Sequence, residues 1–172
     1  MKKHSNNIIS GYSNWQTFTL TFLRVLIGWH FLYEGLIKLY TPEWTSKSYL
    51  LASIGPFSSF FKALANSTSM LPIANFLNEW GLVLIGLSLF VGLFSKQNAF
   101  FGIVLLSFYY LSFPPFPKLG GTGLVEGNYW IVNKNLIEIA ALLVLIAFPS
   151  SHITGLDRFI NATFKLKMQL FD

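Results

Sequence analysis

The sequence predicts an all-α integral membrane protein in which four transmembrane helices form an up-down bundle. Hydrophobic residues make up 53% of the 172 residues and charged residues only 11%, against roughly 25% charged in soluble domains. Four stretches are long and apolar enough to cross a bilayer whose core is about 30 Å thick. These stretches are at about 17–40, 72–94, 98–113 and 131–149, and the whole chain, 1–172, then forms a single membrane domain.

The first span, 17–40, follows a basic and polar segment and lacks the small-residue cleavage site of a signal peptide, so we expect it to be retained. At about 100° per residue, His30, Glu34 and Lys38 fall on one arc of roughly 120°, while Trp29 and Tyr33 lie opposite. The polar face should therefore look into the bundle. Glu34 and Lys38 also have the spacing and order of a helical ion pair.

The segment 41–71 connects the first two spans and has helical character of its own. Apolar residues recur at helical spacing from Leu50 to Leu64, with an interruption at Gly55-Pro56. We expect an interfacial or re-entrant element here. The rival interpretation, a fifth span, is disfavoured by Lys47, Lys62 and the interruption.

The second and third spans should form a tight hairpin, because only SKQN separates them. Asn75, Asn78 and Glu79 share one face of the second span, and its glycines, Gly81, Gly86 and Gly92, would allow close helix contact.

The third span ends at Pro114-Pro115, and the segment 114–130 that follows is rich in Pro and Gly. We expect this segment to be either a mobile cover over the bundle or a plain connector. The fourth span carries Lys134, Asn135 and Glu138 near its start.

The distribution of Lys and Arg predicts the orientation. Slightly more of them flank the side of both termini than the opposite side, so the positive-inside rule places both termini in the cytoplasm. The segments 41–71 and 114–130 are then outer loops, and 150–172 is a cytoplasmic tail.

The intramembrane polar residues converge on one layer. Glu34, Glu79 and Glu138 should each lie roughly 10 Å from the outer boundary, at 1.5 Å per residue, with His30 about one turn deeper. A charge at a helix centre costs about 2.5–3.5 kcal/mol, and intramembrane ionisable residues are functional by default. The alternative is that they form buried ion pairs that only pin the bundle. The candidate site residues are Arg24, His30, Glu34, Lys38, Asn78, Glu79, Tyr109, Asn135 and Glu138, with Arg24 positioned near the inner side.

Composition argues against several classes of cofactor and partner. The chain has no cysteine, which removes disulfides, iron–sulfur clusters and thiolate zinc sites. His30 alone does not provide bis-histidine haem ligation, and no metal-ligand spacing is recognisable, so we expect no metal, haem or zinc. Without a basic block the +5 net charge does not indicate nucleic acid.

The run Arg24-x-x-x-Gly28-x-x-Phe31-x-x-x-Gly35-x-x-Lys38 is followed by TPEWTS, by WGLVLIGLSLFVGLFSK at 80–96 and by NKNLIE at 133–138. Over roughly residues 12–150 this pattern resembles the DoxX/DoxD membrane family, most closely the DoxD-like small subunit of thiosulfate:quinone oxidoreductase. The resemblance implies a multi-pass protein of a bacterial or archaeal cytoplasmic (inner) membrane that works with a second subunit to pass electrons from thiosulfate to quinone. It also implies that Arg24, Glu34, Lys38, Glu79, Asn135 and Glu138 line the site.

We therefore expect a quinone-binding membrane subunit of an oxidoreductase. His30 or Lys38 would donate to the quinone carbonyls, and the three glutamates would carry protons to the outer surface. Electrons would come from a small substrate such as thiosulfate, or from a second subunit or extracytoplasmic redox protein. The alternative is a non-catalytic membrane anchor or assembly subunit that holds an extracytoplasmic enzyme through 114–130; a small-anion or proton carrier is a third interpretation, less favoured.

Overall fold

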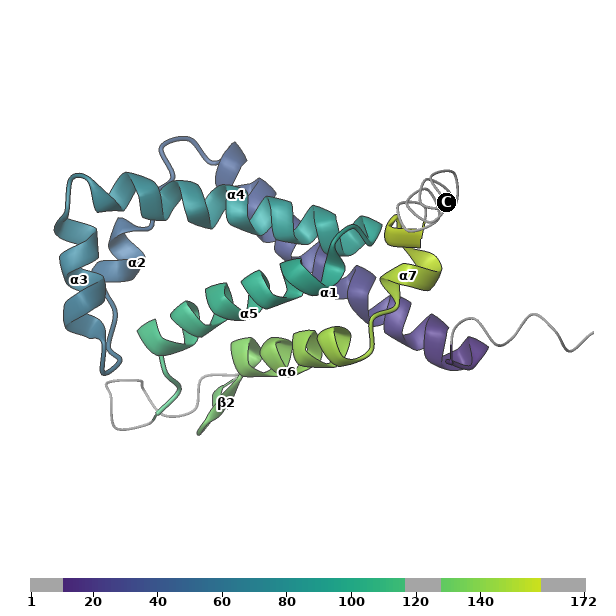
Figure 1. Cartoon of the computed structure of the whole chain (residues 1–172). Coiled ribbons are helices and arrows are strands. Elements are labelled where there is room, and N and C mark those ends of the chain that lie inside the picture. Colours follow the sequence, from purple (N-terminus) through teal and green to yellow (C-terminus); the bar gives the residue numbers. More distant parts are fainter. Residues whose placement is uncertain (1–10, 117–127, 159–172) are drawn as a thin grey trace, which may run out of the picture.

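The computed structural model describes residues 11–116 and 128–158 and is helical except for one short hairpin (Figure 1). Its elements are α1 (Asn14–Tyr40), α2 (Lys47–Leu51), α3 (Ser58–Asn66), α4 (Met70–Val91), α5 (Ser95–Ser112), β1 (Asn128–Tyr129), β2 (Val132–Asn133), α6 (Lys134–Ala147) and α7 (Ser151–Thr154). Each predicted span falls on a long helix, α1, α4, α5 or α6. Two of these, α1 and α4, are long and apolar enough to cross a membrane, whereas the crossing of α5 and α6 stays a prediction.

The ends of the long helices follow from local sequence. Ser13 and Gln16 form a capping box at the start of α1, in which the Ser13 hydroxyl accepts from the Gln16 N–H at 3.2 Å and the Gln16 side chain accepts from the Ser13 N–H at 2.8 Å. Gly92, at a φ of 75°, ends α4 in the left-handed conformation that glycine adopts without strain.

The fourth helix differs from the predicted span 131–149 at its start. Asn133 caps α6 by accepting from the Leu136 N–H at 3.1 Å, so the helix begins at Lys134. The residues before it pair as a hairpin, with Asn128 opposite Asn133 and Tyr129 opposite Val132. The prediction from apolar composition began the span three residues too early, because a helix start depends on one capping side chain, which an average over many residues does not detect.

The four long helices run in alternating directions and pack as two pairs, α1 with α4 and α5 with α6 (Figure 1). Glycine allows the closest contact, because a Cβ on Gly28 would stand 2.6 Å from the Phe90 nitrogen and a Cβ on Gly86 would stand 2.8 Å from the Gly28 carbonyl oxygen. The prediction for Gly86 is confirmed. Gly81 has no atom within 4 Å of such a Cβ, so the same prediction for Gly81 is wrong.

Helices α2 and α3 form a separate unit beside the start of α4 and the end of α5 (Figure 1). Leu50, Phe61 and Ala65 are buried in a small cluster with Leu111 packed against it. The chain between these helices is tied to α5, since the N–H groups of residues 54 and 55 donate to the carbonyl of Ser112 at 3.1 and 3.3 Å. The predicted interruption at Gly55-Pro56 is the break between α2 and α3.

The two faces of α1 differ as the helical phase predicts. Phe31 is 1% exposed, while Trp29 and Tyr33 on the other face are each 52% exposed. Large exposed apolar side chains also cover the outer faces of α4, α5 and α6. Such a surface is costly in water and suits contact with lipid.

Candidate functional site

A cavity of about 340 Å³ lies between the two helix pairs, towards the end that α2 occupies. All four long helices contribute to its lining, and so do residues 44–46 and Tyr49. Seven of the predicted site residues line it: His30, Glu34, Lys38, Asn78, Tyr109, Asn135 and Glu138. The cavity therefore collects polar side chains that are far apart in the sequence.

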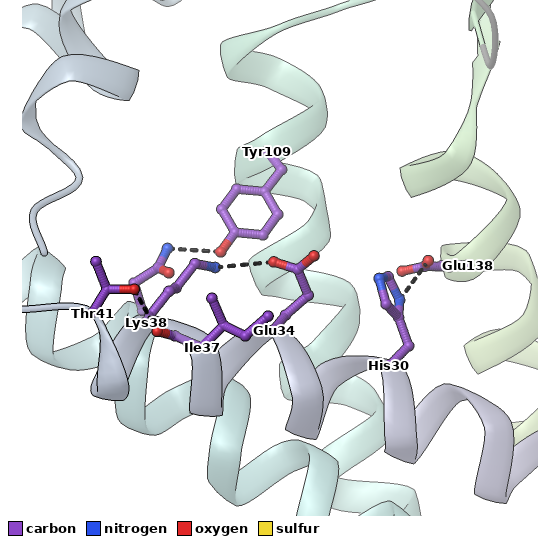
Figure 2. Close-up of polar contacts among 8 residues, drawn as sticks. His30, Glu34, Ile37, Lys38, Thr41, Tyr109 and Glu138 are labelled. Atoms are coloured by element: carbon purple, nitrogen blue, oxygen red, sulfur yellow. Dashed lines mark hydrogen bonds and ion pairs between the residues drawn. The ribbon is translucent and has the colours of Figure 1, made fainter.

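One side of the cavity is formed by an ion pair between α1 and α6. The Nδ1 atom of His30 lies 2.8 Å from a carboxylate oxygen of Glu138, and their side chains are 39% and 19% exposed (Figure 2). The prediction that His30 lies about one turn deeper than the carboxylates stays a prediction. The offset between neighbouring helices comes from their packing, which loop lengths do not specify.

The predicted helical pair between Glu34 and Lys38 is confirmed, with the Lys38 Nζ 3.7 Å from a Glu34 oxygen (Figure 2). The same ammonium lies 5.5 Å from the centre of the Trp44 ring and 5.7 Å from that of Tyr109. Both distances are within the range of cation–π attraction. Lys38 is thus held at the cavity by one carboxylate and two rings.

Tyr109 and Asn78 form the third polar pair. The Asn78 amide donates to the Tyr109 hydroxyl at 2.7 Å, so the hydroxyl keeps its own hydrogen for another acceptor. The Asn78 side-chain oxygen is buried and has no partner among the described residues. This pair can therefore offer the Tyr109 hydroxyl to a ligand as a hydrogen-bond donor.

The segment after α1 covers the cavity, which the sequence did not lead us to expect. Trp44, Ser46 and Tyr49 are among its lining residues. Asn75 of α4 holds the segment by accepting from the Ser46 N–H at 2.9 Å and its hydroxyl at 2.7 Å, and by donating to Thr45 at 3.1 Å. The TPEWTS run was the available signal, although nothing in its composition shows which way it folds.

Tyr49 packs its ring against two others, 4.6 Å from Phe113 and 6.0 Å from Tyr109 between ring centres. Although 40% of the residue stays accessible, the desolvation that accompanies this packing raises the pKa of Tyr49 to about 12. Its hydroxyl is therefore neutral across the physiological range.

Two predicted site residues lie outside the cavity lining. Arg24 is 2% exposed and donates to the carbonyl of Leu89 at 2.7 Å, nearer the other end of α1, which fits a positioning role. Glu79 interacts electrostatically with Lys38 without lining the cavity. Adjacent residues on a helix point about 100° apart, and here Asn78 takes the inward position.

The charges at the cavity nearly balance. Lys38 and Lys134 face Glu34 and Glu138, with His30 as a further titratable group. The remaining wall includes Phe31, Leu82 and Leu106. Within residues 11–116 and 128–158, no group of three or more His, Asp or Glu is arranged to hold a metal ion. A cavity of this kind suits a neutral molecule with an apolar ring and polar substituents.

No family model, curated protein or solved structure matches the chain.

Proposed function

We propose that the protein is a membrane subunit of a quinone-linked oxidoreductase of the DoxX/DoxD type and that the cavity binds the quinone head group. The observation that carries the proposal is the convergence of the His30–Glu138, Lys38–Glu34 and Asn78–Tyr109 pairs on one cavity. In this proposal α1, α4, α5 and α6 all cross a bacterial or archaeal inner membrane. The protein works there with a second subunit or an extracytoplasmic redox partner.

Size and polarity support a quinone over an anion. Pockets for small molecules typically measure roughly 300–1,000 Å³ and combine apolar walls with a few placed polar groups, and this cavity of about 340 Å³ lies at the lower end. A free inorganic anion such as thiosulfate would meet two carboxylates beside the two lysines. A quinone ring is neutral and can stack on Trp44 or Tyr109.

The polar pairs provide what the reduction of a quinone requires. Each carbonyl that gains an electron needs a hydrogen-bond donor and then a proton, so a quinol forms from one quinone, two electrons and two protons. Tyr109, Lys38 and His30 are donors among the residues that line the cavity. Glu34, whose side chain is 45% exposed, and Glu138 are the carboxylates that would pass protons. Electrons would come from a small substrate such as thiosulfate or from the partner.

Two adjacent tyrosines provide a matched test. The protein is purified in detergent, its bound lipids are extracted and analysed for quinone, and quinone affinity is measured. The Tyr109→Phe variant should bind quinone roughly 3- to 10-fold more weakly, the effect of losing one hydrogen bond. Tyr110→Phe is the control, because the Tyr110 hydroxyl donates to the Ile131 carbonyl at 2.8 Å and does not line the cavity.

The proposal fails if the extract holds no quinone and quinone produces neither binding nor a rise in melting temperature. Equal affinities of the two tyrosine variants would remove Tyr109 from the site while leaving quinone binding in place.

A membrane anchor or assembly subunit is the second candidate, favoured by the exposed hairpin at the cavity end of α6. Tyr129 and Trp130 there are 67% and 68% exposed, which is typical of residues that dock on a partner. Glu138→Gln separates the two candidates. Lost turnover in an intact complex favours the quinone site, whereas unchanged turnover with lost assembly favours the anchor.

A further inference from the structure

The four long helices do not enclose the cavity equally. In the ring α1–α4–α5–α6, the α1–α4 and α5–α6 contacts are extensive, and α1 and α6 touch least of the neighbouring pairs. The α1–α4 pair is held at van der Waals distance by Gly28 and Gly86. The bundle thus consists of two closely packed helix pairs with a seam on either side, and the cavity lies between the pairs.

The seam between α4 and α5 is closed at the cavity end. Helices α2 and α3 pack there through the cluster of Leu50, Phe61 and Ala65, with Leu71 of α4 and Leu111 of α5 against it. Two segments fasten this unit: Asn75 on α4 holds Ser46, before α2, and the Ser112 carbonyl on α5 accepts from the N–H groups of residues 54 and 55, between α2 and α3. The segment before α2 also lines the cavity.

The seam between α1 and α6 is bridged differently. Among the described residues the one ion pair that joins these helices is His30–Glu138, at 2.8 Å, and both residues also line the cavity. Figure 2 shows the two side chains meeting from opposite helices, while Glu34 and Lys38 pair within α1. Apart from this pair, apolar side chains of both helices, Ile27 and Phe31 on α1 and Leu142 on α6, belong to the shared core cluster.

The opposite end of the bundle is tied together and can act as the fixed end if this seam opens. The hydroxyls of Thr21 and Thr154 lie 2.7 Å apart, which links α1 to α7. The Asp157 carboxylate accepts from the Phe94 N–H at 2.8 Å, and its own N–H donates to the Gly92 carbonyl at 3.0 Å. α7 and the residues just after it thus join α1 to the connection between α4 and α5, away from the cavity.

We propose that the α1–α6 seam is a lateral opening to the membrane, latched by the His30–Glu138 pair. The ligand is an amphiphile whose polar ring enters from the lipid through this seam and whose apolar tail stays in the seam when the ring is bound. This inference rests on the proposed quinone function and adds the route and the tail. Leu26, one turn before His30 on α1, and Ile137, next to Glu138 on α6, are apolar and 49% and 57% exposed, which gives the tail a compatible surface.

Cross-linking across the seam tests the route, and the chain has no native cysteine to interfere. The double variant His30→Cys/Glu138→Cys is reconstituted in liposomes and compared before cross-linking with a short bis-thiosulfonate, after it, and after reduction. Binding of decylubiquinone is followed by quenching of tryptophan fluorescence, with Trp44→Phe to assign the signal. Because all three states lack the same two side chains, only the closure of the seam differs.

Cross-linking should lower the association and dissociation rates together by at least about tenfold, and reduction should restore both. A tailless benzoquinone should be slowed less than the tailed one. Unchanged rates in the cross-linked protein would overturn the lateral opening while leaving quinone binding intact. Absence of quenching in the wild-type protein would instead refute the proposed function and, with it, this inference.

A second variant serves if the double cysteine protein does not fold. Glu138→Gln keeps the shape of the side chain and weakens the latch, so both rates should rise several-fold. Glu79→Gln is the matched control, since within the described part of the chain Glu79 neither lines the cavity nor forms a salt bridge. Equal rates in the two variants would contradict the latch.

Discussion

Replacing Gly86 with alanine should force α1 and α4 apart. A Cβ at this position would clash with the Leu32 nitrogen, stand 2.6 Å from the Leu32 Cα and 2.8 Å from the Gly28 carbonyl oxygen. All three atoms are backbone, so no side chain can turn away to make room. The helices must separate by about 1 Å to bring these contacts to ordinary distances of about 3.4 Å.

Two opposing effects set the magnitude. Overpacking in a close contact costs about 1–3 kcal/mol, whereas alanine in place of glycine inside a helix stabilises by about 0.5–1 kcal/mol. We therefore expect Gly86→Ala to lower the free energy of unfolding by about 1–2 kcal/mol. Gly81→Ala lies in the same helix with nothing within 4 Å of its Cβ, so only the favourable effect remains and this control should be equal to or slightly more stable than the wild type.

The free energy of unfolding can be measured by titrating the detergent-solubilised protein with a denaturing detergent and following far-UV circular dichroism. Quinone affinity is measured on the same samples, because Phe31 and Leu82 of these two helices line the cavity. If Gly86→Ala proves as stable as Gly81→Ala, the backbone contact between α1 and α4 is not as close as the structure has it.

Two further predictions concern the segment over the cavity. Asn75→Ala removes three hydrogen bonds to this segment, so amide exchange at residues 44–49 should accelerate by at least about tenfold while Asn98→Ala, at the other end of the bundle, leaves it unchanged; equal exchange would contradict the fastening. Tyr49, with its pKa raised to about 12, should contribute stability that is complete below about pH 10 and lost as the pH rises towards 12. The difference between the ultraviolet titration curves of the wild type and of Tyr49→Phe reports the ionisation of Tyr49. A midpoint near pH 10 would refute the prediction.

Local pattern predicted the helices and their inward faces well. The polar face of α1 was visible in the spacing of His30, Glu34 and Lys38, since residues three or four apart share a helix side. The Glu34–Lys38 pair could be predicted for the same reason, as both partners are on one helix. The partner of His30 was less predictable, because its pairing with Glu138 joins two different helices.

The cover of the cavity could not be predicted, because it depends on contacts between distant segments. Asn75 was expected to face the bundle, yet its role is to hold Ser46, 29 positions earlier. Glu79 was grouped with the other carboxylates, and its neighbour Asn78 takes the inward position instead.

The sequence by itself determined that the chain is helical, that its long helices are apolar enough for lipid contact, and which side of each carries polar residues. These properties depend on composition and on a 3.6-residue period, both of which are local. Only the tertiary structure decided that the helices form two pairs, that Asn78 meets Tyr109 and His30 meets Glu138, and that residues 44–49 cover the cavity between them. Those contacts arise from how closely the helices approach and how far each is offset, which depends on the packing of the whole chain.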